Sequence, residues 1–124
     1  METEIIFGQV VSKANNYVVG DGATGRHIVK SARLKAYERC FARQCKIYRD
    51  RYINSHFTLF VKVYEESRRY DLDNALKTIL DCLQMVHAIT DDNLCLKIVA
   101  EKKIDSRNPR VEFAIQEHTP SLFP

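Results

Sequence analysis

Apolar residues recur at two different spacings along this 124-residue chain, and the spacings predict which segments form strands and which form helices. Residues 4–11 and 56–64 are rich in β-branched and aromatic side chains, which is typical of strands. Residues 94–102 and 110–115 follow the same pattern, and a turn containing Pro109 separates them. The sequence therefore predicts four strands.

A longer spacing predicts two helices. Residues 31–52 are predicted to form a helix capped by Ser31, because apolar residues recur there at steps of three and four. Its predicted core-facing residues are Leu34, Tyr37, Phe41, Cys45, Tyr48 and Tyr52. A second helix is predicted to start at Asp71 and end at Val86 or His87, with Leu72, Leu76, Ile79, Leu83 and Val86 on its buried side. Gly20, Gly22 and Gly25 interrupt the segment before the first helix, which predicts a loop with hairpin character.

The order of these elements predicts the fold class. Strands and helices in this order favour an α/β (α+β) architecture, in which two main helices cover a single mixed sheet of about four or five strands. We find no internal repeat and no linker, so we expect one domain over residues 1–124, with residues 118–124 as a flexible tail.

The composition excludes several classes of protein. No apolar run is long enough to cross a bilayer, and the first residues lack the pattern of a signal peptide, so we expect a cytoplasmic protein without a membrane partner. The four cysteines have no metal-binding spacing and are interpreted as reduced apolar side chains. The three glycines do not match a nucleotide-binding loop, so no small-molecule cofactor is expected.

Charge is distributed unevenly along the chain. The net charge is only +3, but residues 26–51 carry nine basic and two acidic residues, so this window has a charge of +7 and the remainder −4. Four cations recur along the first helix on a face separate from the apolar stripe: Lys35, Arg39, Arg43 and Lys46. Such a face can follow a phosphate backbone, which makes these residues candidates for DNA binding. The alternative is an ordinary solvated surface.

Acidic residues gather around the second helix. Asp71 and Asp73 lie at its start with Lys77 one turn further on, and Asp91 and Asp92 follow its end. We expect the strand after Asp92 to pair beside the strand that precedes Asp71 and so to bring the aspartates together. Converging carboxylates repel one another unless a cation intervenes, and Mg²⁺ prefers oxygen ligands. Such a site suits phosphodiester hydrolysis by an activated water.

A simpler interpretation of the same acids stays open. Asp71 or Asp73 can be a helix cap, and Asp73, Lys77 and Asp81 can form a ladder of exposed ion pairs. Asp91 and Asp92 then belong to a polar turn.

The combined pattern resembles the signature of the RusA-like Holliday junction endodeoxyribonucleases. It comprises Asp71-Leu-Asp73-Asn74, then Lys77, Asp81 and the Asp91-Asp92 pair, and the likeness extends over roughly residues 5–116. The segment from Ser12 to Tyr17 is similar to the early asparagine-bearing loop of that family, and the segment from Lys30 to Tyr37 to the start of its first helix.

The resemblance implies a homodimer that grips a four-way DNA junction and makes paired cuts with Mg²⁺ or Mn²⁺. It implies that Asp71, Asp73 and Asp92 bind the metal, with Asp91 a less certain member, and that Lys77 is the essential lysine. The predicted catalytic residues are thus Asp71, Asp73, Lys77 and Asp92.

Two basic residues just before this motif, Arg68 and Arg69, are further candidates for holding the DNA strand. Two alternatives to a junction resolvase remain open. One is a nuclease of broader specificity that acts on flaps and other branched DNA. The other is a catalytically silent DNA-binding module in which the aspartates are structural.

Overall fold

The computed structural model describes residues 1–13, 17–22 and 25–118. The elements are β1 (Glu4–Phe7), β2 (Tyr17–Gly22), β3 (Gly25–Lys30), α1 (Ala32–Gln44), β4 (Phe57–Glu65), α2 (Leu72–Met85), a 3₁₀ turn (Asp92–Leu94), β5 (Cys95–Ile104) and β6 (Arg110–Glu117). Among the described residues, no helix is both long and apolar enough to cross a membrane.

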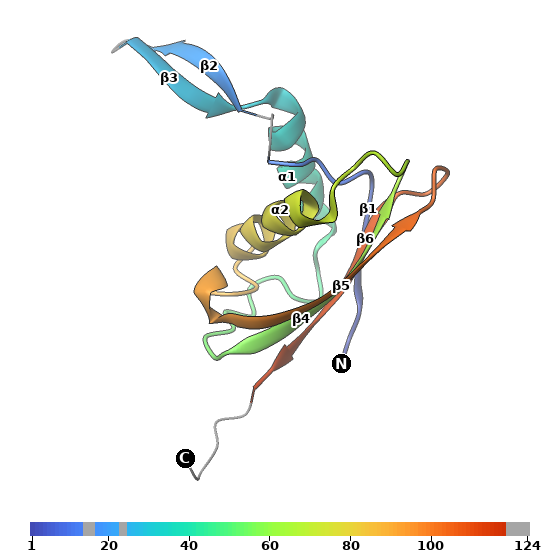
Figure 1. The fold of residues 1–124 in the computed structure, drawn as a ribbon. Helices are drawn as coiled ribbons and strands as arrows, with labels where there is room; N and C mark the ends of the chain where they lie inside the picture. Colours follow the sequence, from blue (N-terminus) through green and yellow to red (C-terminus); the bar gives the residue numbers. More distant parts are fainter. Residues whose placement is uncertain (14–16, 23–24, 119–124) are drawn as a thin grey trace.

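The main sheet has four strands in the order β1-β6-β4-β5. Strands β4 and β5 are parallel, and the other two pairs are antiparallel, so the sheet is mixed. Both helices lie on one face of it (Figure 1). The α+β fold predicted from the sequence is confirmed.

Strands β2 and β3 form a separate two-stranded hairpin that projects beyond the start of α1 (Figure 1). The sequence predicted a loop with hairpin character here, and the pairing extends from Tyr17–Lys30 to Gly22–Gly25. Residues 14–16, which carry part of the asparagine-bearing segment, lie outside the described residues, as does the predicted tail except for His118.

The core lies between the helices and the sheet. Alternate residues of β4 (Phe57, Leu59, Val61 and Val63) are buried against the helices, together with Phe113 of β6. The rings of Phe41 on α1 and Phe113 are stacked, with centroids 5.9 Å apart. Such ring pairs add about 0.5–1.5 kcal/mol beyond the area they bury.

Helix α1 ends eight residues before the predicted Tyr52. Its predicted start is confirmed, since the Ser31 hydroxyl accepts a hydrogen bond from the Leu34 amide at 3.2 Å. After Gln44 the chain leaves the helix because Glu4, buried on β1, accepts hydrogen bonds from three successive backbone amides. These are the amides of Lys46, Ile47 and Tyr48, at 3.0, 2.7 and 3.2 Å from one carboxylate oxygen.

Two sequence predictions are therefore wrong. Lys46 lies beyond the end of the helix rather than on it. Tyr52 is 56% exposed instead of buried, and its ring stacks on that of His87. The apolar spacing continued past Gln44 because Cys45 and Tyr48 are buried in the core without being helical.

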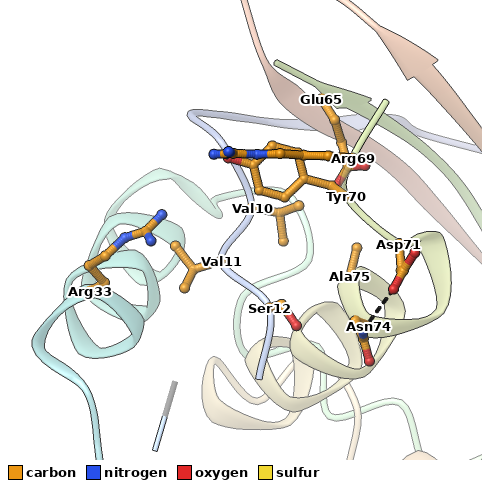
Figure 2. A pocket seen from close by; sticks show the side chains of 10 residues that line it. All are labelled: Val10, Val11, Ser12, Arg33, Glu65, Arg69, Tyr70, Asp71, Asn74 and Ala75. Atoms are coloured by element: carbon orange, nitrogen blue, oxygen red, sulfur yellow. Dashed lines mark hydrogen bonds between the residues drawn. The ribbon is translucent and has the colours of Figure 1, made fainter. Parts of the chain in front are cut away.

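Strand β1 also ends early, at Phe7 instead of Val11. Gly8 has a φ of +113°, a conformation open mainly to glycine, and its amide donates to the Pro109 carbonyl. Val10 and Val11 remain buried. The chain that follows β1 is therefore led toward the helices, beside the start of α2 (Figure 2).

Candidate metal centre

The start of α2 carries an aspartate that the helix does not use. Asp71 occupies the capping position, yet its side chain accepts no capping hydrogen bond from the first turn. Its nearest hydrogen-bond partner is the Asn74 amide group, at 3.5 Å from Oδ2 (Figure 2). An aspartate that merely capped the helix would accept a backbone N–H in this turn. The Asp71 carboxylate is exposed and available to a ligand.

Asp73 and Lys77 follow on the exposed side of α2, one turn apart. The predicted alternative, a ladder of ion pairs through Asp73, Lys77 and Asp81, is not formed. Among the described residues Lys77 makes no ion pair, and Asp81 pairs instead with Lys13 at 2.5 Å. Asp73 and Lys77 thus point to solvent without a partner in the part of the chain that the structure describes.

The Asp91-Asp92 pair divides into two different environments. The Asp91 side chain caps the 3₁₀ turn and accepts from the Asn93 amide at 2.8 Å. The backbone amide of Asp92 donates to the Gln84 side chain at 2.6 Å, whereas its carboxylate is exposed and makes no hydrogen bond to the described residues. Of the two, Asp92 has the carboxylate that remains available.

The predicted convergence of these acids within one chain is wrong. Strands β4 and β5 do pair, but they are parallel, with Glu65 at the end of β4 opposite Ile104 at the end of β5. Helix α2 must therefore carry the chain back to the end of the sheet at which β4 begins, because β5 begins at that end as well. Its 14 residues span about 20 Å.

Asp71 caps the start of α2, and the Asp92 amide donates to Gln84 near its end, so the two acids lie at opposite ends of this helix. Within the described part of a single chain, no three His, Cys, Asp or Glu residues lie close enough together to hold a metal ion. The three predicted metal ligands are thus separated into a pair at the start of the helix and a single acid at its end.

A pocket of about 240 Å³ lies at the start of α2 (Figure 2). Its polar walls combine two acids with two guanidinium groups: Glu65 and Asp71 with Arg33 and Arg69. Arg33 lies across the pocket from Asp71, and the Arg69 guanidinium stacks on the Tyr70 ring, 5.1 Å from its centroid. This arrangement can receive a cation on one side and an anion on the other.

Glu65 lines the same pocket and was not predicted from the sequence. It is only 1% exposed, and its Oε2 has no hydrogen-bond partner among the described residues. Burial raises the pKa of this carboxyl, Lys102 and Gln9 lower it, and the nearby Asp71 charge raises it again. The missed signal was the alternation of β4, in which position 65 continues the row of core-facing residues but holds an acid.

The donors at this end of α2 fit a hard divalent cation. They are carboxylate oxygens with an amide nearby, and one buried carboxylate oxygen lacks a partner. Mg²⁺ and Mn²⁺ favour such oxygen ligands.

The predicted DNA-binding residues occupy two places. Lys35, Arg39 and Arg43 are exposed on the side of α1 that faces away from the core, and no described residue forms an ion pair with them. Lys46 is exposed beyond the end of α1, as noted. Arg69 lines the pocket, and the backbone of Arg68 and Tyr70 is held by Lys102, whose Nζ donates to their carbonyls at 3.1 and 2.7 Å.

An α+β fold with acids and a lysine at the start of α2 and exposed basic residues along α1 suits a protein that acts on nucleic acid. A comparison with protein families identifies which one: the RusA endodeoxyribonuclease model matches residues 8–116. The chain therefore belongs to the RusA endodeoxyribonuclease family. No curated protein matches it.

Proposed function

We propose that this endodeoxyribonuclease cuts four-way DNA junctions as a homodimer and depends on Mg²⁺ or Mn²⁺. The observation that carries the proposal is the Asp71 carboxylate, which occupies a capping position without capping. Asp73 and Lys77 stand exposed beside it on the same helix. Acids and a lysine that the fold does not use are well suited to bind a ligand.

Each residue has a distinct role in this proposal. Asp71, Asp73 and Asp92 hold the cation, and the Lys77 ammonium group donates to an oxygen of the scissile phosphate. The bound cation supplies the activation of a water molecule and neutralises the charge that develops on the phosphate. Asp91 remains the cap of its turn.

A second copy of the chain is needed to complete the site. Asp92 lies a helix length away from Asp71 in its own chain, which is too far for both to bind one ion. In a two-fold dimer the two α2 helices can run antiparallel, so the end of one helix can face the start of the other. Asp92 of one copy then joins Asp71 and Asp73 of its partner.

Strand β5 offers a surface for this association. It is a ten-residue edge strand with exposed apolar side chains, among them Leu96, Val99 and Ile104. A long apolar edge favours pairing with another strand. Antiparallel pairing of two β5 strands places the start of one, next to Asp92, beside the end of the other, on the side of Asp71.

The basic residues supply the grip on DNA. Lys35, Arg39 and Arg43 on α1 contact the phosphate backbone, with Lys46 extending the row past the helix. Arg68 and Arg69 hold the strand near the metal site. The whole chain, residues 1–124, acts as a single nuclease domain, and His118, predicted to begin a tail, is held by the hydrogen bond from its amide to the His56 carbonyl at 2.8 Å.

Cleavage assays on three DNA substrates test the proposal. A four-way junction, a flap and a linear duplex are incubated with the protein in Mg²⁺ or in EDTA. We expect paired cuts in the junction with Mg²⁺ and none in EDTA. Equal cutting of the flap would favour the broader nuclease, and binding without cutting in either Mg²⁺ or Mn²⁺ would favour a silent module.

A further inference from the structure

Glu65 is an acid in a position that the core normally reserves for apolar residues. It is the last residue of β4 and continues the row of Leu59, Val61 and Val63 that faces the helices. Its side chain is 99% buried and borders the pocket at the start of α2. A buried carboxylate without compensation is costly, so the position calls for a positive partner.

The neighbouring groups do not fully supply that partner. The Lys102 charge lowers the pKa of Glu65, but its ammonium group donates to the carbonyls of Arg68 and Tyr70. A side-chain hydrogen bond from Gln9 lowers the pKa of Glu65, but the Gln9 amide group also accepts from the Glu66 amide at 2.8 Å and donates to the Val10 carbonyl at 3.1 Å. Oε2 of Glu65 still has no hydrogen-bond partner among the described residues.

The two pocket guanidiniums are not committed to Glu65 either. No ion pair joins Arg33 or Arg69 to Glu65 in the described part of the chain, although all three line the pocket. Arg69 is held over the Tyr70 ring and donates to its hydroxyl at 3.1 Å. Both guanidiniums are thus available to donate to phosphate oxygens, a pairing that their planar geometry favours.

We propose that Glu65 is a further ligand of the cation held by Asp71, bound within the pocket at the start of α2. The proposal rests on the metal dependence proposed above and adds a residue to the site. Because no three described acids of one chain lie close enough together to share an ion, Glu65 and Asp71 are its direct ligands from one chain, and Asp73 contacts the cation through one of the waters that Mg²⁺ keeps. A divalent cation between Glu65 and Asp71 satisfies the unpaired Oε2 and balances both carboxylates. Arg33 and Arg69, on the other walls, can then hold the phosphate that the cation also contacts.

Mn²⁺ titration by calorimetry, on the full chain without DNA, tests this role. Glu65→Gln preserves the shape of the side chain but removes its charge, and we expect Mn²⁺ to bind about 10- to 100-fold more weakly. Glu66→Gln is the matched control, because it makes the same substitution at the next residue, whose side chain is exposed. It should keep the affinity of the unmodified protein.

Thermal melts distinguish a ligand from a structural residue. Without metal, Glu65→Gln should melt at or above the temperature of the unmodified protein, since a buried unpaired charge is gone, and Mn²⁺ should raise its melting temperature less. A lower melting temperature with unchanged Mn²⁺ affinity would overturn the proposal. If Glu65→Gln fails to fold, Glu65→Asp keeps the charge but withdraws it from the pocket, and unchanged Mn²⁺ affinity there would equally overturn it.

Asp71→Asn separates this proposal from the proposed function. If Asp71→Asn loses Mn²⁺ binding while Glu65→Gln retains it, Glu65 is not a ligand and the metal site at Asp71 stands. If both variants bind Mn²⁺ as the unmodified protein does, the metal site at the start of α2 is contradicted as well.

Discussion

Two helix-capping positions in this molecule hold side chains with different tasks. The Ser31 hydroxyl bonds to the first turn of α1, whereas the Asp71 carboxylate at the start of α2 bonds to no backbone amide of its helix. The same position in a helix makes a capping side-chain hydrogen bond in one case and none in the other.

Substitutions at these two positions should therefore have opposite effects. Ser31→Ala should lower the free energy of unfolding by about 1 kcal/mol and leave cleavage intact. Asp71→Asn should lower the free energy of unfolding by no more than about 1 kcal/mol, from the lost attraction to the helix dipole, but should abolish cleavage. Urea denaturation and a cleavage gel measure both. Normal cleavage by Asp71→Asn would remove this residue from the active site.

The residues of the candidate site were predictable only in part. Asp71, Asp73, Lys77 and Asp92 could be selected because their spacing along one helix and the following turn is local. Glu65 escaped because a single acid in an apolar strand has no motif. Only its burial without a hydrogen-bond partner distinguishes it, and that is a property of the packed structure.

At the scale of elements, the extent of α1 was beyond local prediction. The apolar spacing continues to Tyr52, but the helix ends where Glu4, more than forty residues earlier, binds three backbone amides. The bounds of α2 were predicted closely, since its capping residues are Asp71 and Val86, the predicted start and one of the two predicted ends.

Glu4 should consequently be a major contributor to stability. Glu4→Ala leaves three amides without their acceptor and should cost about 3 kcal/mol of unfolding free energy, measured by urea denaturation. Glu2→Ala is the control, because Glu2 is exposed and pairs with Arg51 at the surface, where an ion pair contributes less than about 1 kcal/mol. Equal losses in the two variants would contradict the role assigned to Glu4.

The exposed face of α1 is expected to provide affinity for the DNA backbone. Arg39→Ala combined with Arg43→Ala should weaken junction binding and make its salt dependence shallower by about one unit of slope for each lost phosphate contact. Lys62→Ala combined with Arg107→Ala removes equal charge from exposed residues of β4 and the turn before β6, and should keep the slope of the unmodified protein. A double variant of α1 with the slope of the unmodified protein would exclude this helix from the DNA interface.

At the scale of the whole molecule, the mixed sheet and the pairing of β4 with β5 were predicted, but the consequence of that pairing was not. Parallel strands begin at the same edge of a sheet, so a helix between β4 and β5 has to return across it. The acid before β5 therefore cannot lie beside the acid that follows β4. The predicted pairing of β4 with β5 is confirmed, and because these strands are parallel it places Asp92 and Asp71 at opposite ends of them.

This separation makes the edge of β5 the expected place for a partner. Val99→Lys puts a charge in the middle of that edge and should shift sedimentation equilibrium toward monomer at micromolar concentration. Ile28→Lys is the control, since Ile28 is 73% exposed on the β2–β3 hairpin, away from β5. A dimer that survives Val99→Lys would place the interface elsewhere.

Subunit complementation tests the shared site most directly. Asp71→Asn and Asp92→Asn should each be inactive alone, because every site in either homodimer lacks one ligand. In a mixed dimer, one site combines the intact Asp71 of one copy with the intact Asp92 of the other. Mixing the two inactive variants, with subunit exchange verified by differently tagged chains, should therefore restore cutting of one strand of a four-way junction. A mixture that exchanges subunits and still fails to cut would contradict a site shared between two copies.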